Sequence, residues 1–422
     1  MRIFIYTKVR TIVRCSAFCT ESVPFLENIF LKKLFLSLSL IFSFVLCASV
    51  FSEEVLDSYF GYSLDVPEGF SVVEHTPDGM SYLFKHGNAP VFLLLKIYTG
   101  KNASSASECF DLAMSKLGGK YESDKILWRN VPCVVSMFDV RLPGNSEDSK
   151  GWGVGVLLPE KDAVLVLLSY TESSNFDSWQ QFILSTLNSL SVDTGSFTAP
   201  GIIASYAYPD SGEVSATLEI ASHPIRTRFG KDDAEASRFV RDMEFSVFSL
   251  YVNHPKWKEA WIRYYRAVFR DSVGRLKKAS FDIYSALYSD CEMKNPKNPM
   301  VAMNEILLGW VQSMPYARET SDARNTDFTD LVSALQGKES DCDSRSLLMC
   351  ALLRSMGADT AFFVSREYSH AVYGILLEVP GAKISVDGKA YLLNETTAKG
   401  VAPGLIEQSQ SQTEKWIPVT FK

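Results

Sequence analysis

The segment SDCDSRSLLMCALLRSMG, residues 340–357, is the feature that most constrains the fold of this chain. Its apolar residues recur at helical spacing over residues 347–352, and Gly357 stands where such a helix would end. Ser340 or Asp341 can cap the start of the helix. The pattern therefore predicts a helix with a polar first turn and one face packed in a core.

Cys342 falls in the first turn of this predicted helix, between two aspartates. Unpaired backbone N–H groups and the positive end of the helix dipole favour a thiolate there. The same N–H groups can stabilise an oxyanion on a carbonyl under attack. Asp341 and Asp343 oppose ionisation, since negative neighbours raise the pKa of a thiol. Cys342 is therefore a candidate nucleophile if a histidine lies within reach, and a small core residue if none does.

One histidine follows the cysteine. His370 begins HAVYGILLEV, residues 370–379, whose branched and aromatic content is typical of a strand. The next strand-like run is AYLLNETT, residues 390–397. Antiparallel pairing of the two runs would bring Glu395 to the histidine ring, whereas Asn394 would face the opposite side. We therefore predict that His370 is the base for the cysteine and that Glu395 orients its ring.

Together with WVQSMPY, residues 310–316, these motifs resemble the transglutaminase-like superfamily, whose core is a papain-like Cys-His-Asp hydrolase fold. Its bacterial members typically show G-D-C before an apolar helix that ends in L-L-R-x-x-G. They then show H-A-W on a strand and W-V-x-x-D-x-T on the next. The resemblance covers residues 300–400 and implies Cys342 as nucleophile, His370 as base and Glu395 in place of the Asp.

The sequence departs from the family pattern at three positions. Ser340 stands where the family has glycine, Val372 replaces the tryptophan of H-A-W, and Glu395 is one carbon longer than aspartate. The resemblance also implies an oxyanion donor at Gln312, as in papain-like enzymes. The alternative for Gln312 is a polar residue on the flank of a helix.

The predicted function is that of an exported cysteine hydrolase or acyl transferase that acts on a peptide or isopeptide bond. Its partner would be a protein or peptide substrate, and it would need no cofactor and no metal. No phosphate-binding loop, serine nucleophile elbow, H-E-x-x-H or C-x-x-C motif is present. Two alternatives stay open: a catalytically inactive transglutaminase-like binding module of the cell envelope, or a protein whose functional part is its first domain.

Residues 1–52 are interpreted as a signal peptide or an N-terminal anchor. A dilysine precedes an apolar run over residues 34–51, and Ser52 offers a cleavage site. The run is also just long enough to span a bilayer. A lipid-modified Cys47 is disfavoured by the bulky residues before it. All of these predict a periplasmic or extracellular body, with membrane attachment only through this segment.

Residues 54–194 predict an α+β domain with an antiparallel sheet. Runs rich in Val, Leu, Tyr and Phe indicate strands, and two runs with polar starts and apolar spacing of three to four indicate helices. The pattern resembles the PsbP/Mog1-like sandwich, and we interpret the domain as a binding or scaffolding module. The predicted strands lie in YSLDVP, SYLFKH, PVFLLLKIYTG, VPCVVSMFDVRL and AVLVLLSYTES, and the helices in SASECFDLAMSKLGG and NFDSWQQFILSTLNSL.

Residues 200–290 predict a hairpin, with PDSG at residues 209–212 as its turn, followed by helices. Aromatic residues interleave with arginines in those helices, a combination that can clamp nucleic-acid bases. The alternative is a packed aromatic face with snorkelling arginines. Because the net charge is −7, the chain offers no broad surface for phosphate backbones. We therefore favour the packed face and expect no nucleic-acid partner.

Residues 295–422 contain the transglutaminase-like motifs. The chain is thus predicted to be α+β, with an N-terminal antiparallel-sheet and helix domain, a helical linker region and a C-terminal papain-like α+β core. Five of the eight cysteines follow the presumed signal segment. Cys109 and Cys133 share the first domain, so they either form a disulfide or lie buried as small hydrophobic residues.

Overall fold

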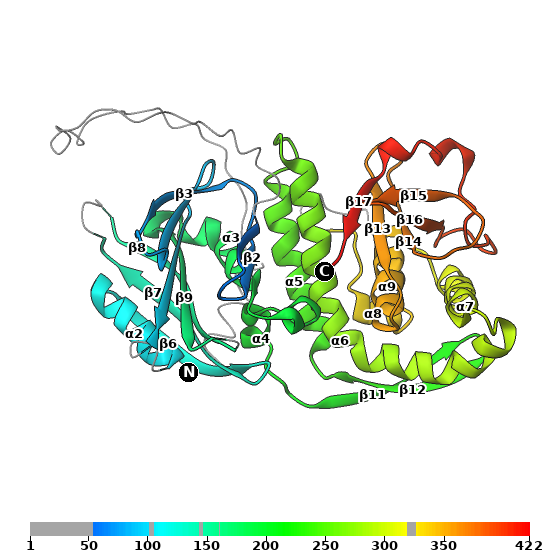
Figure 1. The fold of residues 1–422 in the computed structure, drawn as a ribbon, viewed down its shortest axis with the longest axis horizontal. Coiled ribbons are helices and arrows are strands. Elements are labelled where there is room, and N and C mark those ends of the chain that lie inside the picture. The colour runs from blue at the N-terminus through cyan, green and yellow to red at the C-terminus, as the bar shows by residue number, and fades with distance from the viewer. Residues whose placement is uncertain (1–53, 101–104, 143–146, 160, 319–325) are drawn as a thin grey trace. The chain divides into compact units, whose positions relative to one another are not determined.

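The computed structural model describes residues 54–100, 105–142, 147–159, 161–318 and 326–422. Contacts gather residues 53–422 into one compact unit. The predicted signal peptide or anchor, residues 1–52, lies outside the described residues. Helices and strands both form large parts of the described chain, which confirms the predicted α+β class (Figure 1). No helix within the described ranges is long and apolar enough to cross a membrane.

An antiparallel sheet of seven strands forms the N-terminal part, in the order β3-β4-β5-β9-β8-β7-β6. Helix α2 (Ala106–Leu117) packs on β7, β8 and β9, and helix α3 (Phe176–Asn188) contacts β8 and β9. A smaller sheet joins β1, β2 and β10. The strands are β1 Glu54–Asp57, β2 Tyr62–Asp65, β3 Phe70–His75, β4 Ser81–His86, β5 Phe92–Thr99, β6 Lys120–Trp128, β7 Val131–Val140, β8 Ser149–Leu158, β9 Ala163–Glu172 and β10 Leu190–Ser191.

Strand β8 lies inside the sheet, yet the sequence pattern did not predict it because glycine weakens a strand signal. Its glycines alternate at positions 151, 153 and 155 and so share one face. A Cβ at Gly153 would lie 2.8 Å from the Phe110 ring, and one at Gly155 would lie 2.9 Å from the carbonyl oxygen of Ala106. The glycines therefore allow α2 to approach the sheet closely.

The hairpin predicted within residues 200–290 is present, but at a different place. Residues Ile202–Ala207 form helix α4, and the hairpin lies further on, between β11 (Glu213–Ile220) and β12 (His223–Gly230). Its turn consists of Ala221 and Ser222, both with positive φ (48° and 67°), as a two-residue hairpin loop requires. PDSG instead connects α4 to β11. The signal was missed because neither turn residue is a glycine or an asparagine.

Two long helices follow the hairpin, α5 (Asp233–Ser249) and α6 (Trp257–Lys294). Helix α5 contacts α3 of the N-terminal part, whereas α6 contacts α9 and β17 of the C-terminal part. Figure 1 shows the α5–α6 pair between the seven-stranded sheet and the C-terminal sheet.

The C-terminal part is a five-stranded antiparallel sheet in the order β15-β16-β14-β13-β17. Helix α9 packs on β13 and β14, and its buried residues share one apolar core with α6 and α7. The helices are α7 Pro299–Ser313, α8 Leu331–Leu335 and α9 Cys342–Ser355. The strands are β13 Thr360–Ser365, β14 His370–Ile375, β15 Lys383–Val386, β16 Lys389–Asn394 and β17 Ile417–Thr420.

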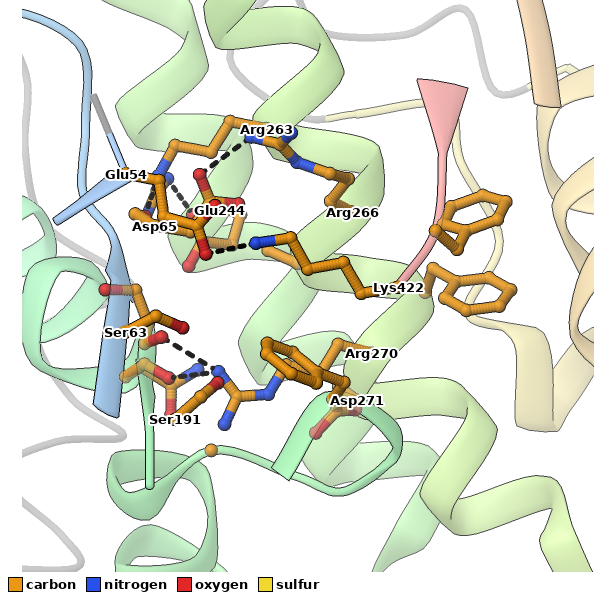
Figure 2. A pocket seen from close by; sticks show the side chains of 17 residues that line it. Glu54, Ser63, Asp65, Ser191, Glu244, Arg263, Arg266, Arg270, Asp271 and Lys422 are labelled. Carbon is orange, nitrogen blue, oxygen red and sulfur yellow. Dashed lines mark hydrogen bonds and ion pairs between the residues drawn. The ribbon is translucent and has the colours of Figure 1, made fainter. Parts of the chain in front are cut away.

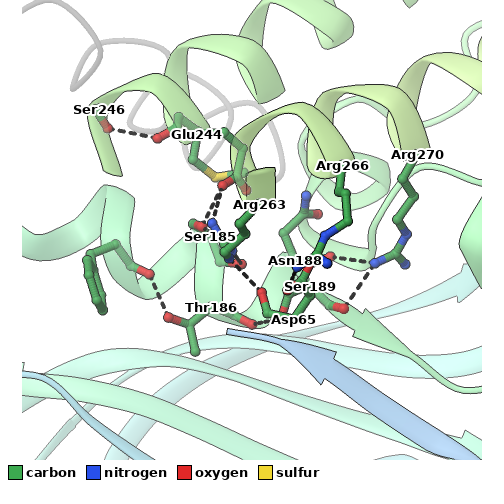
Figure 3. Close-up of polar contacts among 12 residues, drawn as sticks. Asp65, Ser185, Thr186, Asn188, Ser189, Glu244, Ser246, Arg263, Arg266 and Arg270 are labelled. Atoms are coloured by element: carbon green, nitrogen blue, oxygen red, sulfur yellow. Dashed lines mark hydrogen bonds and ion pairs between the residues drawn. The ribbon is translucent and has the colours of Figure 1, made fainter. Parts of the chain in front are cut away.

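The sequence analysis predicted that the arginines of α6 snorkel to solvent, and this prediction is wrong. Arg263, Arg266 and Arg270 lie on one face of the helix and reach β2 and the end of α3 (Figure 3). Arg270 donates to five backbone carbonyl groups, those of residues 188–190, 196 and 199. Burial lowers the pKa of Arg270 to about 10, so its guanidinium stays charged at neutral pH. The arginine row therefore holds the N-terminal part on α6.

A small cavity of about 70 Å³ lies at this junction (Figure 2). Its charged side chains pair largely with one another. Arg266 donates to Asp65 at 2.7 Å, and Lys422 pairs with Glu54. We interpret the cavity as part of the junction between β2, α3 and α6.

All five described cysteines are free and buried. Of the two alternatives for Cys109 and Cys133, the structure shows the second: both are free thiols buried as small hydrophobic residues.

Candidate functional site

Cys342 is the first residue of α9, as the capping pattern predicts. The carboxylate of Asp341 accepts a hydrogen bond from the backbone N–H of Ser344 at 2.9 Å, which makes Asp341 the N-cap. Cys342 itself is 1% exposed. The structure thus places the thiol at a helix N-terminus, under other side chains.

His370 and Glu395 meet through the pairing of β14 with β16. These strands are antiparallel neighbours, and Glu395 follows directly after the last residue of β16. The Nε2 atom of His370 lies 2.7 Å from an Oε2 oxygen of Glu395. The other carboxylate oxygen of Glu395 accepts from the backbone N–H and hydroxyl of Thr397. Both side chains are thereby fixed, and Nδ1 is the ring nitrogen of His370 that Glu395 leaves open.

This pair sets the charge of Glu395. Burial alone would raise the pKa of its carboxyl, but the hydrogen bond and charge of His370, with the bonds from Thr397, lower it to about 2. The carboxylate is only 12% exposed, so solvent screens the pair little.

We expect the ionised Glu395 carboxylate and the hydrogen bonds it accepts to stabilise the fold above about pH 5, and this contribution to be lost toward pH 2. A lowered pKa means that the unfolded chain takes up the proton first, so the stabilisation is complete above the ordinary glutamate value and falls as pH approaches about 2. The total is about 3 kcal/mol. Urea denaturation of the chain and of Glu395→Gln at several pH values measures it. The exposed Glu378→Gln is the control, and equal pH slopes for Glu395→Gln and the unmodified chain would contradict the assignment.

The thiol of Cys342 bonds to an aspartate and not to the histidine. Its Sγ donates to an oxygen of Asp343 at 3.2 Å, and the hydroxyl of Tyr265 from α6 donates to the other oxygen of that carboxylate. No hydrogen bond joins Sγ to His370 among the described residues. Burial, together with the charges of Asp343 and Asp341, raises the pKa of the Cys342 thiol well above its usual range. The resting thiol is therefore neutral.

Asp343→Asn is expected to speed alkylation of Cys342 by iodoacetamide at pH 8 about tenfold. Removing the negative charge lowers the thiol pKa, and one pKa unit changes the thiolate fraction tenfold while that fraction is small. Mass spectrometry of the labelled peptide gives the rate. Asp359→Asn, a partly exposed aspartate of the same part of the chain, is the control. An unchanged or slower rate in Asp343→Asn would show that the carboxylate does not suppress ionisation.

Arg318 is a contact that the sequence did not predict. Its guanidinium lies 3.9 Å from Cys342 Sγ, donates to the carbonyl oxygen of Ser369 and pairs with Asp327 at 3.2 Å. This contact brings a cation to the thiol. A thiolate formed here would therefore gain one favourable charge contact.

The predicted oxyanion role of Gln312 is not supported. Both contacts of its amide nitrogen go to backbone carbonyl oxygens, those of Glu395 and Val401, and its amide oxygen accepts from Gly400. Since both amide hydrogens are engaged, Gln312 holds the segment after β16 and leaves none for a substrate.

Arg345 joins three segments of the site, and sequence reasoning missed it. It is 1% exposed and lies one turn along α9 from the thiol. Its guanidinium donates to the carbonyl oxygens of Met314 and Thr396 and to the hydroxyl of Ser340. Met314 follows α7, Thr396 follows Glu395, and Ser340 precedes the N-cap of α9. Arg345 therefore fixes the position of the thiol relative to Glu395.

A pocket with a volume of about 270 Å³ opens beside His370. We call it the aromatic pocket, because α5, α6 and the segment before α8 line it with rings. The lining comprises Phe245, Phe248, Trp261, Tyr264, Tyr265 and Phe328, with Arg318, Thr326, Asp327, Asp343, Val364, Ser365, Arg366, Ser369 and His370.

Asp341, Cys342 and Asp343 form the one group within the described ranges whose atoms cluster as metal ligands do, within 4.8 Å of one another. Ser344 already binds Asp341, and both the thiol and Tyr265 bind Asp343. These contacts explain the cluster as a helix cap and an anchor for the thiol, and we assign no metal to it.

No protein-family model matches this chain, and no curated protein matches it significantly. A solved structure of the PsbP protein (CyanoP) from Synechocystis sp. PCC 6803 is similar at 12% identity, covering 34% of this chain and 95% of that one, with a TM-score of 0.29. The Ran-binding protein Mog1p from Saccharomyces cerevisiae is similar at 14% identity, covering 34% and 96%, with a TM-score of 0.26. Likenesses this weak assign neither fold nor activity to the chain.

Proposed function

We propose that this chain is an exported cysteine hydrolase or acyl transferase of the transglutaminase-like kind, acting on an amide bond of a protein or peptide. The observation that carries the proposal is the hydrogen bond of 2.7 Å between His370 and Glu395. His370 begins strand β14, which packs against helix α9, and Cys342 is the first residue of that helix. Export rests on the sequence of residues 1–52.

The proposed reaction starts with the neutral thiol. Sγ leaves Asp343 and passes its proton to Nδ1 of His370, while Sγ attacks the carbonyl carbon of the amide. Backbone N–H groups in the first turn of α9 stabilise the oxyanion. The C–N bond then breaks, and the imidazolium gives its proton to the leaving amine. The products of this half are a free amine and a thioester on Cys342.

Water or a second amine resolves the thioester. Nδ1 of His370 removes a proton from the incoming nucleophile, the C–S bond breaks, and the proton returns to the sulfur. Hydrolysis is favoured over transfer, since it needs no second substrate site. Throughout, Glu395 keeps the ring oriented and stabilises the imidazolium.

Acylation by p-nitrophenyl acetate tests this proposal without knowledge of the substrate. The thiol attacks the acetyl carbon and p-nitrophenolate leaves, so colour and intact mass both report an acetyl-thioester. We expect acetylation at Cys342 that is lost in Cys342→Ala and slowed at least about 100-fold in His370→Ala. Cys350→Ala, which removes another buried thiol of α9, should leave it unchanged. Equal acylation in the chain and His370→Ala would overturn the proposal.

The alternative of an inactive binding module has its own supporting observation. Cys342 is buried and its hydrogen bond goes to Asp343, which keeps it neutral. In that case neither p-nitrophenyl acetate nor iodoacetamide would modify Cys342 faster than the other buried cysteines.

A further inference from the structure

The aromatic pocket presents a ladder of stacked rings. The ring of Phe248 lies 6.0 Å from Trp261 at 13° and 5.9 Å from Tyr264 at 28°. Trp257, which lies outside the lining of the pocket, has its ring 5.9 Å from that of Trp261 and tilted by 42° to it. Phe248, Trp257 and Trp261 are all only partly buried. Rings that stack on one another and still face solvent offer flat surfaces to a further ring, which prefers offset or edge contacts of this kind.

Among the described charged residues of the pocket lining, Arg366 is a cation without a carboxylate partner. Arg318 pairs with Asp327, and Asp343 accepts from Tyr265 and Cys342. Arg366 is exposed, and its guanidinium lies 5.2 Å above the ring of Trp257. It forms no ion pair with a carboxylate in the part of the chain that the structure describes. A guanidinium that lies over an aromatic ring and pairs with no carboxylate is available to bind one.

The pocket is also continuous with the candidate catalytic residues. His370, Ser369 and Asp343 all belong to its lining, and Arg318 reaches from it to Cys342 Sγ. A chain that placed a side chain on the ring ladder would therefore pass its backbone close to the histidine.

We propose that the aromatic pocket binds a peptide segment that carries an aromatic side chain and an acidic side chain on neighbouring residues. The ring stacks on Phe248 and Trp261, and the acid pairs with Arg366. Delivery of this segment's amide to Cys342 rests on the proposed function, whereas the binding itself does not.

Isothermal titration of the full chain carrying Cys342→Ala tests binding apart from chemistry. The probes are three capped peptides, acetyl-Glu-Phe-Gly-amide, acetyl-Glu-Ala-Gly-amide and acetyl-Gln-Phe-Gly-amide. We expect the first to bind about tenfold more tightly than the alanine peptide, the loss expected for one stacked ring. The glutamine peptide should bind about threefold more weakly than the first, and this difference should shrink at high salt.

Two further variants in the same background locate the site. Trp261→Ala is expected to remove the preference for phenylalanine, and Arg366→Gln the preference for glutamate over glutamine. Phe281→Ala, an exposed ring elsewhere on α6, should change neither. Arg366 is exposed, so Arg366→Gln should fold normally. This variant therefore still tests the inference if Trp261→Ala fails to fold.

Equal binding of the phenylalanine and alanine peptides, no binding at all, or preferences that survive both variants would overturn the inference. Peptide selectivity together with an unreactive Cys342 would support the pocket and reject the proposed catalysis. An acylated Cys342 without peptide selectivity would support the proposed catalysis and reject the peptide-binding pocket.

Discussion

Arg263→Met is expected to lower the free energy of unfolding by about 4 kcal/mol, because it strands a buried carboxylate without its counter-charge. Arg263 is 3% exposed and Glu244 is 2% exposed. The Nη1 atom of Arg263 lies 2.6 Å from Glu244, and Nη2 donates to the hydroxyl of Ser185, which also donates to Glu244. Burial would lower the pKa of Arg263, but the charges of Glu244 and Asp65 raise it, so the guanidinium stays charged.

Urea denaturation at pH 7 measures this loss. The double variant Arg263→Met with Glu244→Gln should recover part of it, since the neutral amide removes the stranded charge. Lys278→Met, which breaks the ion pair with Asp282 on an exposed part of the same helix, is the matched control and should cost less than about 1 kcal/mol. A cost for Arg263→Met no larger than that of Lys278→Met would mean that the junction does not depend on the pair.

Arg345→Met is expected to cost about 3 kcal/mol and to expose the thiol. Methionine fills part of the space, but the buried carbonyl oxygens of Met314 and Thr396 lose their donor. Through Arg345, these two segments are tied to the first turns of α9, which carry Cys342. We therefore expect alkylation of Cys342 to become faster at a fixed pH while the pH dependence keeps its form.

The matched control for this variant is Arg354→Met in the last turn of α9. Arg354 is partly exposed and donates to Asp359 and to the carbonyl oxygen of Phe421, so its loss should cost about 1 kcal/mol and leave the thiol unaffected. Faster alkylation in Arg354→Met as well would indicate general loosening of the helix.

The His370–Glu395 pair could be predicted from the sequence because it depends on local rules. Alternation along a strand fixes which side chains share a face, and antiparallel pairing of nearby strands brings those faces together. Strand β15, which the sequence pattern did not separate from the connection, lies between β14 and β16 in the chain but pairs only with β16. Both rules operate within thirty residues of sequence. The same holds for the cap at Asp341, which needs only the first turn of its own helix.

The immediate surroundings of Cys342 could not be predicted in this way. Tyr265, which holds Asp343, comes from a helix far upstream, and its position depends on how α6 packs. Arg345 lies between two serines near the polar start of α9, where a charged side chain is expected to be exposed. The amide of Gln312 is bound by a segment whose path no local pattern specifies. Tertiary packing decided each of these contacts.

Helix α6 has one further consequence, which concerns its rotational phase. Arg263, Arg266 and Arg270 point to the N-terminal part, while Tyr265 and Phe269 point to Asp343 and Phe421 of the C-terminal part. One inserted residue turns everything after it by about 100°. An insertion between Arg263 and Arg270 would therefore rotate the residues after it relative to those before it. The two halves of the helix could then no longer both keep their contacts with the N-terminal and C-terminal parts. Substitutions along this stretch of helix preserve the rotational phase of the two faces, whereas any insertion or deletion changes it.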